Sequence, residues 1–279
     1  DLKDRARLDE VFAKYKPVAV MHFAALSQVG EAMSEPGRYW ANNTGGSLNL
    51  IEAAVAAGCL NFVFSSTCAT YGEHDNVVLD ENTPQLPLNA YGASKRAVED
   101  ILQDFGASAG LNSVIFRYFN VAGADPEAEV GEFHRPETHL VPLVLDAIDG
   151  KRDALTIFGT DYDTPDGTGV RDYIHVIDQA DGHRAALRFL KSESGSYAFS
   201  LGTDIGLSAL KMVRAFEEVS GARVPYQVVS RRPGDVAECY ANPAKAEAQL
   251  RWRTTRGVED MCANAWAFRC KAEVGETVA

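Results

Sequence analysis

A tyrosine and a lysine stand four residues apart in the segment Tyr91-Gly-Ala-Ser-Lys95. On a helix this spacing places both side chains on one face, with the lysine ammonium close to the tyrosine phenol. A neighbouring positive charge favours the ionised phenol and so lowers its pKa. Such a tyrosine acts as a general base toward a hydroxyl group. Taken alone, the motif is also compatible with a chance pair on a solvated helix face.

A small hydroxyl cluster precedes this pair. The apolar run at 62–64 leads into Ser65, Ser66 and Thr67. In a parallel sheet, ligands bind at the carboxyl ends of the strands, so Thr67 is expected to stand beside Tyr91 and to hydrogen-bond a reacting hydroxyl. Hydroxyl groups that satisfy a turn are the alternative. The two features together are far more specific than either alone.

Strands and helices must alternate to bring these residues together. Short apolar runs predict strands, and apolar residues at helical spacing predict helices between them. This order is typical of parallel βαβ units and an α/β fold. The expected strands are 18–23, 61–66, 113–119 and 170–176, and the expected helices are 4–15, 39–57, 91–109, 178–190, 207–220, 243–250 and 257–270.

Composition narrows the possible partners. The net charge is −12 and no basic cluster is present, which argues against nucleic acid and against an anionic membrane surface. No apolar run reaches the roughly 18 residues of a membrane span. The five cysteines are scattered and odd in number, which favours free thiols in a reducing compartment, the cytoplasm.

Several segments then carry a family resemblance. The chain resembles the UDP-glucose (UDP-galactose) 4-epimerases of the extended short-chain dehydrogenase/reductase family, and the similarity runs in family order over nearly the whole chain. The stretch 166–176 is the most specific of these segments. The matching segments are His22-Phe-Ala-Ala-Leu, Asn42-Asn-Thr-Gly-Gly, Phe64-Ser-Ser-Thr-Cys-Ala-Thr-Tyr-Gly72, Tyr91-Gly-Ala-Ser-Lys95, Arg117-Tyr-Phe-Asn-Val-Ala-Gly123, Ile157-Phe-Gly, Asp166-Gly-Thr-Gly-Val-Arg-Asp-Tyr-Ile-His-Val176 and Arg231-Arg-Pro-Gly-Asp235.

The resemblance implies a Rossmann-like doubly wound parallel sheet with a smaller α/β substrate-binding domain. Residues 1–120 and 170–192 would form the NAD-binding part, and residues 121–169 and 193–279 the UDP-sugar-binding part. It also implies a homodimer, formed through the helices expected at 39–57 and 91–109.

The resemblance further implies epimerisation at C4 of a UDP-hexose with NAD as cofactor. Tyr91 would take the proton from the sugar 4-hydroxyl, Thr67 would hydrogen-bond the 4-oxygen, and Lys95 would hold the nicotinamide ribose. Hydride would pass to NAD⁺ and return to the other face of a transient 4-keto sugar. No metal is implied. The remaining implied cofactor contacts are Asp1, Leu2, Phe23, Ala24, Ala25, Leu26, Ser27, Asn42 and Phe119.

The implied substrate contacts lie mostly in the second half of the chain. Arg171 and Arg232 suit a diphosphate, because each guanidinium offers a planar fork of donors. Asp235 suits the uridine ribose. Surface salt bridges are the alternative role for both arginines. Apart from Thr67 and Tyr91, the other implied contacts are Asn120, His139, Leu140, Thr156, Ile157, Phe158 and Cys239.

Cys239 matches a position of the family that controls sugar size and is occupied by either a bulky or a small residue. A cysteine leaves room beside C2 of the sugar, so an N-acetylated substrate, UDP-GlcNAc or UDP-GalNAc, is expected to be accepted as well. An ordinary buried thiol is the alternative.

Two positions depart from the family pattern. His139 stands where an asparagine is common. In addition, no glycine-rich turn opens the chain, and Asp1-Leu2 matches the end of the family's third strand. About fifty residues that hold the pyrophosphate are therefore expected to be absent from this sequence. We expect an exposed apolar sheet edge at 18–23 and weak NAD binding by the 279 residues alone.

Other functions remain as alternatives. A sugar-nucleotide 4,6-dehydratase has the same fold but needs an Asp-Glu pair after Thr67, where this chain has Cys68 and Ala69. Epimerases for UDP-xylose, UDP-arabinose or UDP-glucuronate are harder to exclude. An inactive protein that only binds sugar nucleotides is a third alternative. The intact Tyr91, Lys95 and Thr67 argue against it for a longer parent protein, whereas lack of activity stays an alternative for the 279 residues alone.

Overall fold

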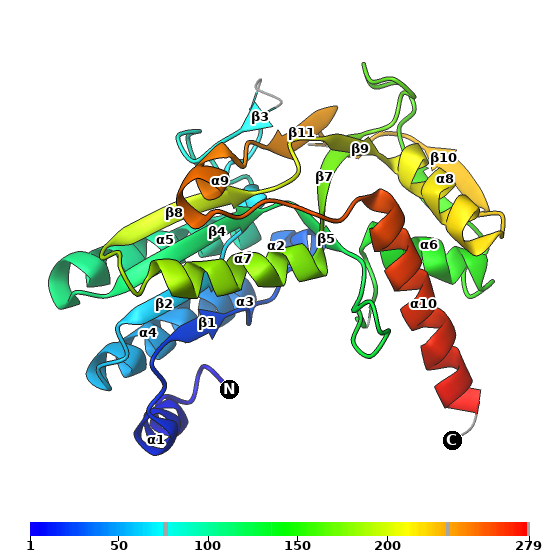
Figure 1. The fold of residues 1–279 in the computed structure, drawn as a ribbon. Helices are drawn as coiled ribbons and strands as arrows, with labels where there is room; N and C mark the ends of the chain where they lie inside the picture. The colour runs from blue at the N-terminus through cyan, green and yellow to red at the C-terminus, as the bar shows by residue number, and fades with distance from the viewer. Residues whose placement is uncertain (75–77, 135, 233–234, 278–279) are drawn as a thin grey trace.

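The structure is a computed structural model that describes all residues except 75–77, 135, 233–234 and 278–279. Figure 1 shows its two parts. The helices are α1 (Arg5–Tyr15), α2 (Val29–Ser34), α3 (Pro36–Tyr39), η1 (Trp40–Gly45), α4 (Gly46–Ala56), η2 (Cys68–Thr70), α5 (Ala90–Ala109), α6 (Leu140–Ile148), α7 (Val176–Phe189), α8 (Ala209–Ser220), α9 (Ala244–Leu250) and α10 (Val258–Thr277). The strands are β1 (Val20–His22), β2 (Asn61–Ser65), β3 (Val78–Leu79), β4 (Asn112–Tyr118), β5 (Asn120–Ala122), β6 (Leu155–Phe158), β7 (Val170–His175), β8 (Ser196–Leu201), β9 (Gly206–Ser208), β10 (Tyr226–Val229) and β11 (Glu238–Ala241).

The first part is a parallel sheet in the order β1-β2-β4-β8, with helices on both faces. Side chains alternate between the faces, as strand geometry requires. Phe62 and Phe64 of β2 pack with α1, α4 and α5, whereas Val63 packs with α7 and α9. Both faces are therefore buried, which explains why the strands appear in the sequence as continuous apolar runs.

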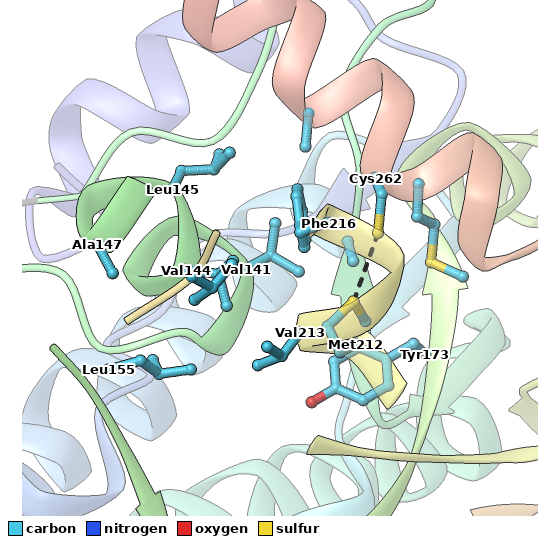
Figure 2. Close-up of a cluster of buried hydrophobic side chains, with 14 of the residues drawn as sticks. Val141, Val144, Leu145, Ala147, Leu155, Tyr173, Met212, Val213, Phe216 and Cys262 are labelled. Atoms are coloured by element: carbon cyan, nitrogen blue, oxygen red, sulfur yellow. Dashed lines mark hydrogen bonds between the residues drawn. The ribbon is translucent and has the colours of Figure 1, made fainter. Parts of the chain in front are cut away.

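The second part is built around its own core (Figure 2). Helices α6, α8 and α10 pack together with β6, and the thiol of Cys262 lies 3.7 Å from the sulfur of Met212 at their centre. A mixed sheet, β3-β11-β7-β5 with β9 antiparallel to β7, lies between this core and the first sheet. The α/β class and the parallel sheet are confirmed.

The chain passes between the two parts several times. Strands β4 and β5 are separated by one residue yet belong to different sheets, and β8 returns to pair with β4. Because β8 begins at Ser196, the first sheet extends beyond the boundary expected at residue 192. Helix α6 and the strands β5, β6 and β8–β11 were not expected from the sequence. None of the described helices has the length and apolar character needed to cross a membrane.

Candidate active site

The start of α5 is held against the end of β2. The side chain of Asn89 caps the helix by accepting a hydrogen bond from the amide of Gly92 at 2.9 Å. A Cβ atom at position 92 would lie 2.2 Å from the carbonyl oxygen of Ala69, so only glycine permits this close approach of α5 to η2. The approach brings Tyr91 beside Thr67.

Tyr91 and Thr67 meet as the sequence predicted. Their side chains are hydrogen-bonded, and Thr67 is 6% exposed at the N-cap of η2. Burial raises the pKa of Tyr91, and the hydrogen bond with Thr67 partly opposes that rise. The pKa shift thus has the opposite direction to the one predicted from the Tyr-Lys spacing.

The position of Lys95 accounts for this difference. Its ammonium donates a hydrogen bond to the carbonyl oxygen of Ser65 at 2.8 Å and lies 4.8 Å from the centre of the Phe64 ring. Burial lowers the pKa of Lys95 to about 7, although Glu99 opposes the shift. Both members of the pair therefore face the end of β2, but in this structure the ammonium interacts with the strand and not with the phenol.

A buried ion pair supports the same strand end. Arg117 and Glu99 are joined at 2.6 Å, and their side chains are only 6% and 1% exposed. Ser66 donates a short hydrogen bond to Glu99. The carboxylate therefore connects α5 to β4 and to the residue just before Thr67. A pair this well hydrogen-bonded fixes positions more than it adds stability, because burying both charges is itself costly.

Further buried polar groups contact Ser65, the last residue of β2, and they were not predicted from the sequence. The hydroxyl of Ser65 lies 3.0 Å from Nε2 of His183, and Tyr118 is hydrogen-bonded to Ser65 and Gln179. Their signal in the sequence is weak, because single polar residues inside apolar elements reveal their partners only in three dimensions.

The predicted cofactor residues 23–27 form the loop after β1. Asn43 holds this loop: its amide oxygen accepts from the backbone of Leu26 at 2.8 Å, and its amide nitrogen donates to the Leu26 carbonyl at 3.0 Å. Phe23 is 52% exposed and lies against His183, with 4.6 Å between the ring centres. His22 is a buried core residue, and its Nε2 atom lies 2.7 Å from the hydroxyl of Ser47. The exposed backbone and the small side chains of Ala24 and Ala25 offer a flat ligand close approach.

The other predicted cofactor residues surround this loop. Asn42 lies on η1 and donates to Asn43, while Leu2 packs on α4 and accepts a hydrogen bond from Asn49 at 3.0 Å. Asp1 begins the turn before α1, and Phe119 separates β4 from β5.

The predicted diphosphate ligand Arg171 lies on β7 beside Cys239 of β11, which is its register partner. Its guanidinium donates to the carbonyl of Val236 at 2.9 Å and lies 3.6 Å from the carboxylate of Asp235. Burial raises the pKa of Cys68 to about 12. Electrostatic interaction with Cys239 also raises this pKa, whereas interaction with Arg171 lowers it. Since Cys68 directly follows Thr67, the predicted catalytic hydroxyl lies close to the predicted substrate residues Arg171 and Cys239.

The remaining predicted substrate residues lie around the second part. The Arg232 guanidinium stacks 3.7 Å from the centre of the Phe158 ring, and Asn120 donates to the Asp172 carbonyl at 3.1 Å. Thr156 is half-buried on β6, but Ile157 is 2% exposed with its side chain in the core, so only its backbone is available. Leu140 opens α6. Pro233 and Gly234 of the matched segment lie outside the described residues.

His139 caps α6 without a side-chain cap bond and instead contacts Glu132 at 2.5 Å. The hydrogen bond with Glu132 is the main reason that the pKa of His139 is raised. The histidine is 49% exposed and belongs to an acidic and imidazole cluster.

The profile of the NAD dependent epimerase/dehydratase family matches residues 1–202. The chain belongs to this family. A UDP-glucose 4-epimerase from Rhizobium leguminosarum bv. trifolii is 47% identical over 272 residues, which cover 98% of this chain and 83% of the relative.

Solved structures of the family have the same fold. A UDP-glucose 4-epimerase from Brucella ovis in complex with NAD matches with a TM-score of 0.93 and 42% identity, over 96% of this chain and 83% of the other. The enzyme from Bifidobacterium longum in complex with NAD⁺ and UDP matches with a TM-score of 0.93 and 37% identity, over 99% of this chain and 83% of the other.

Proposed function

We propose that this protein is an NAD-dependent isomerase that interconverts UDP-glucose and UDP-galactose by inversion at C4. The observation that carries the proposal is the hydrogen-bonded pair Tyr91–Thr67 at the carboxyl end of β2, with Lys95 one helical turn away. The similarity to UDP-glucose 4-epimerases over 98% of the chain supports the same activity.

Each residue of the pair has a separate role in this proposal. Tyr91 takes the proton from the sugar 4-hydroxyl as the C4–H bond breaks, and it returns the proton after the 4-keto sugar has turned over. Thr67 holds the 4-oxygen in line with the phenol, so that proton transfer needs no rearrangement. Lys95 would hold the ribose of the bound cofactor.

The residues around β1 fit NAD. The loop 23–27 exposes its backbone and small side chains, and Asn43 holds it in place from η1. Bound NAD⁺ supplies the acceptor and donor of hydride together with a positively charged ring. Such a charge next to Tyr91 opposes the rise in pKa that burial produces, because it stabilises the phenolate.

The UDP group is proposed to lie along β7 and β11. Arg171 and Arg232 supply the cations for the diphosphate, and Asp235 supplies an acceptor for the uridine ribose. Cys239 stands beside the sugar and leaves space at C2, so UDP-GlcNAc is proposed as a second substrate.

The decisive experiment measures UDP-galactose conversion by full-length protein in an assay coupled to UDP-glucose oxidation. Tyr91→Phe should lower kcat by about 100-fold or more, because it removes the general base, with little change in KM. Tyr226→Phe, at an exposed tyrosine of β10, is the matched control and should leave kcat unchanged. Full activity of Tyr91→Phe would refute the proposed role.

Organisation and location belong to the same proposal. The nucleotide-binding part is assigned to 1–120 and 170–192 and is extended by β8, while the remaining segments form the sugar-binding part. We propose a homodimer through α5 and the η1–α4 region, where Trp40 of η1 is exposed, and light scattering of the protein in solution would measure its molar mass. The five cysteines, scattered and odd in number, favour the cytoplasm.

A further inference from the structure

Four side chains with metal-binding atoms converge in the loop before α6. Glu132, His134, Glu137 and His139 each offer one such atom, and these atoms all lie within 4.8 Å of one another. All four lie within residues 132–139, and their spacing is not that of a common metal-binding motif. Of the four, only His139 was a predicted substrate contact, and the catalytic roles proposed above use none of them.

Three of the contacts between these side chains have lengths close to those in a tetrahedral ion site. Metal–ligand bonds of about 2.0–2.2 Å place neighbouring ligand atoms roughly 3.4 Å apart. Nδ1 of His134 lies 3.2 Å from Oε1 of Glu132 and 3.5 Å from Oε2 of Glu137, and Nδ1 of His139 lies 3.4 Å from Oε1 of Glu137. To admit an ion, the contact between His139 and Glu132, at 2.5 Å, must lengthen by about 1 Å, and Glu137 must present one of the two oxygens that contact the two histidines separately.

The chemistry of the ligands selects the kind of ion. Imidazole nitrogen suits zinc and its first-row neighbours, whereas magnesium and calcium prefer sites made of oxygen alone. Two carboxylates and two neutral imidazoles also balance the charge of one dication. We propose that Glu132, His134, Glu137 and His139 bind one divalent transition ion of the zinc type.

The loop is held in shape by contacts outside the cluster. Gly131 packs under the ring of Phe268 on α10, where a Cβ atom would lie 2.2 Å from the ring. Lys271 donates to the carbonyl of Glu127 at 3.1 Å, and Gln28 donates to the carbonyl of Pro136 at 3.3 Å. These contacts bring the ligands together before an ion arrives, which lowers the entropy lost on binding.

The site also has an open side. His134 and His139 are 47% and 49% exposed, while Glu132 and Glu137 are 22% and 12% exposed. An ion therefore enters from solvent without unfolding the loop. Once bound, it ties the loop to the residue just before Leu140 and so fixes the first turn of α6.

Metal binding is tested directly and does not depend on epimerase activity. Full-length protein freed of metals with EDTA is titrated with Co²⁺ while the visible spectrum is recorded, and Zn²⁺ is then added as a competitor. We expect one Co²⁺ per chain with the intense visible bands of a tetrahedral site, and displacement by Zn²⁺.

Variants locate the ion. His134→Ala and Glu132→Gln should each weaken Co²⁺ binding at least tenfold, because each removes a ligand. Glu129→Gln, an exposed glutamate of the same loop, is the matched control and should bind like the parent. Absence of saturable binding, equal binding by all variants, or the near-ultraviolet bands of a cobalt–thiolate bond would each overturn the proposal.

Discussion

Lys95 carries an ammonium into a place where water does not reach. It is 4% exposed, and its hydrogen bond to Ser65 and its contact with the Phe64 ring replace only part of the lost hydration. The lowered pKa of Lys95 reflects this loss of hydration. The fold therefore keeps Lys95 in an environment that disfavours its charged form, as is common for residues of functional sites.

The stability of the protein should record this burial as a function of pH. The pKa of Lys95 is about 7 when folded and 10.5 in its ordinary environment, so the unfolded chain binds the extra proton between these values. The destabilisation is fully present below pH 7 and is relieved as the pH rises toward 10.5. In urea unfolding, Lys95→Met should have a higher free energy of unfolding than the parent at pH 6. This difference should shrink by roughly 2–3 kcal/mol between pH 6 and pH 9.

Lys191→Met is the control for this measurement, because Lys191 is an exposed lysine just after α7. Its stability difference from the parent should not vary with pH. A Lys95→Met difference that is equally flat would show that the ammonium is not buried in solution.

The thiol of Cys239 gives a prediction about sugar choice. Cys239→Tyr should fill the space beside C2 and lower kcat/KM for UDP-GlcNAc roughly tenfold or more, while UDP-galactose turnover changes little. Comparison of the two substrates by product chromatography provides the measurement. Cys239→Ser keeps the size and should keep both activities; loss of both activities in Cys239→Tyr would indicate general damage instead of a gate.

For single residues, the sequence predicted which residues form the site better than it predicted the contacts between them. The spacing of Tyr91 and Lys95 predicted a shared helix face, and the structure confirms that both face β2. The sign of the pKa shift of Tyr91 was not predictable, because it depends first on burial and then on electrostatic interaction with residues distant in the sequence, such as Tyr118. The Glu99–Arg117 pair was missed for the same reason.

The junction between α5 and η2 gives a prediction at the level of elements. Gly92→Ala places a methyl group against the backbone of Ala69, which cannot yield as a flexible side chain would. We expect a loss of about 1–3 kcal/mol in unfolding free energy and a lower kcat, since Tyr91 must move from Thr67. Chemical unfolding and the epimerase assay measure both effects.

Gly30→Ala is a suitable comparison, because no atom lies within 4 Å of a Cβ atom at that position of α2. Its stability should be unchanged or slightly increased, since alanine favours a helix over glycine. If Gly92→Ala behaves in the same way, the close approach of α5 to η2 does not position the tyrosine.

The periodic elements were predictable and the irregular ones were not. Helix α5 was expected at 91–109 and lies at Ala90–Ala109, because its apolar face and its closing Gly110 are both explicit in the sequence. Strands β5, β9 and β11 have only three or four residues, too short for a periodic signal. Helix α6 is so apolar that it shows no polar face from which to recognise a helix.

The whole molecule should unfold as one unit. The two parts are connected by β4–β5, β7–α7 and the return of β8, so neither sheet is complete without segments from both halves of the sequence. Calorimetry of the full-length protein is therefore expected to give a single transition. Two resolved transitions would show that the parts fold independently.

Because the chain passes repeatedly between the two parts of the fold, this arrangement also affects how the sugar specificity of one relative can be introduced into another. The walls of the proposed pocket come from separate stretches around Asn120, Leu140, Arg171 and Cys239, interleaved with segments that build the nucleotide-binding sheet. Exchanging one contiguous block would carry foreign sheet packing along with the pocket wall. New specificity in this enzyme is therefore accessible through scattered point substitutions, whereas chimaeras made with a single crossover would tend to lose the fold before they gain a substrate.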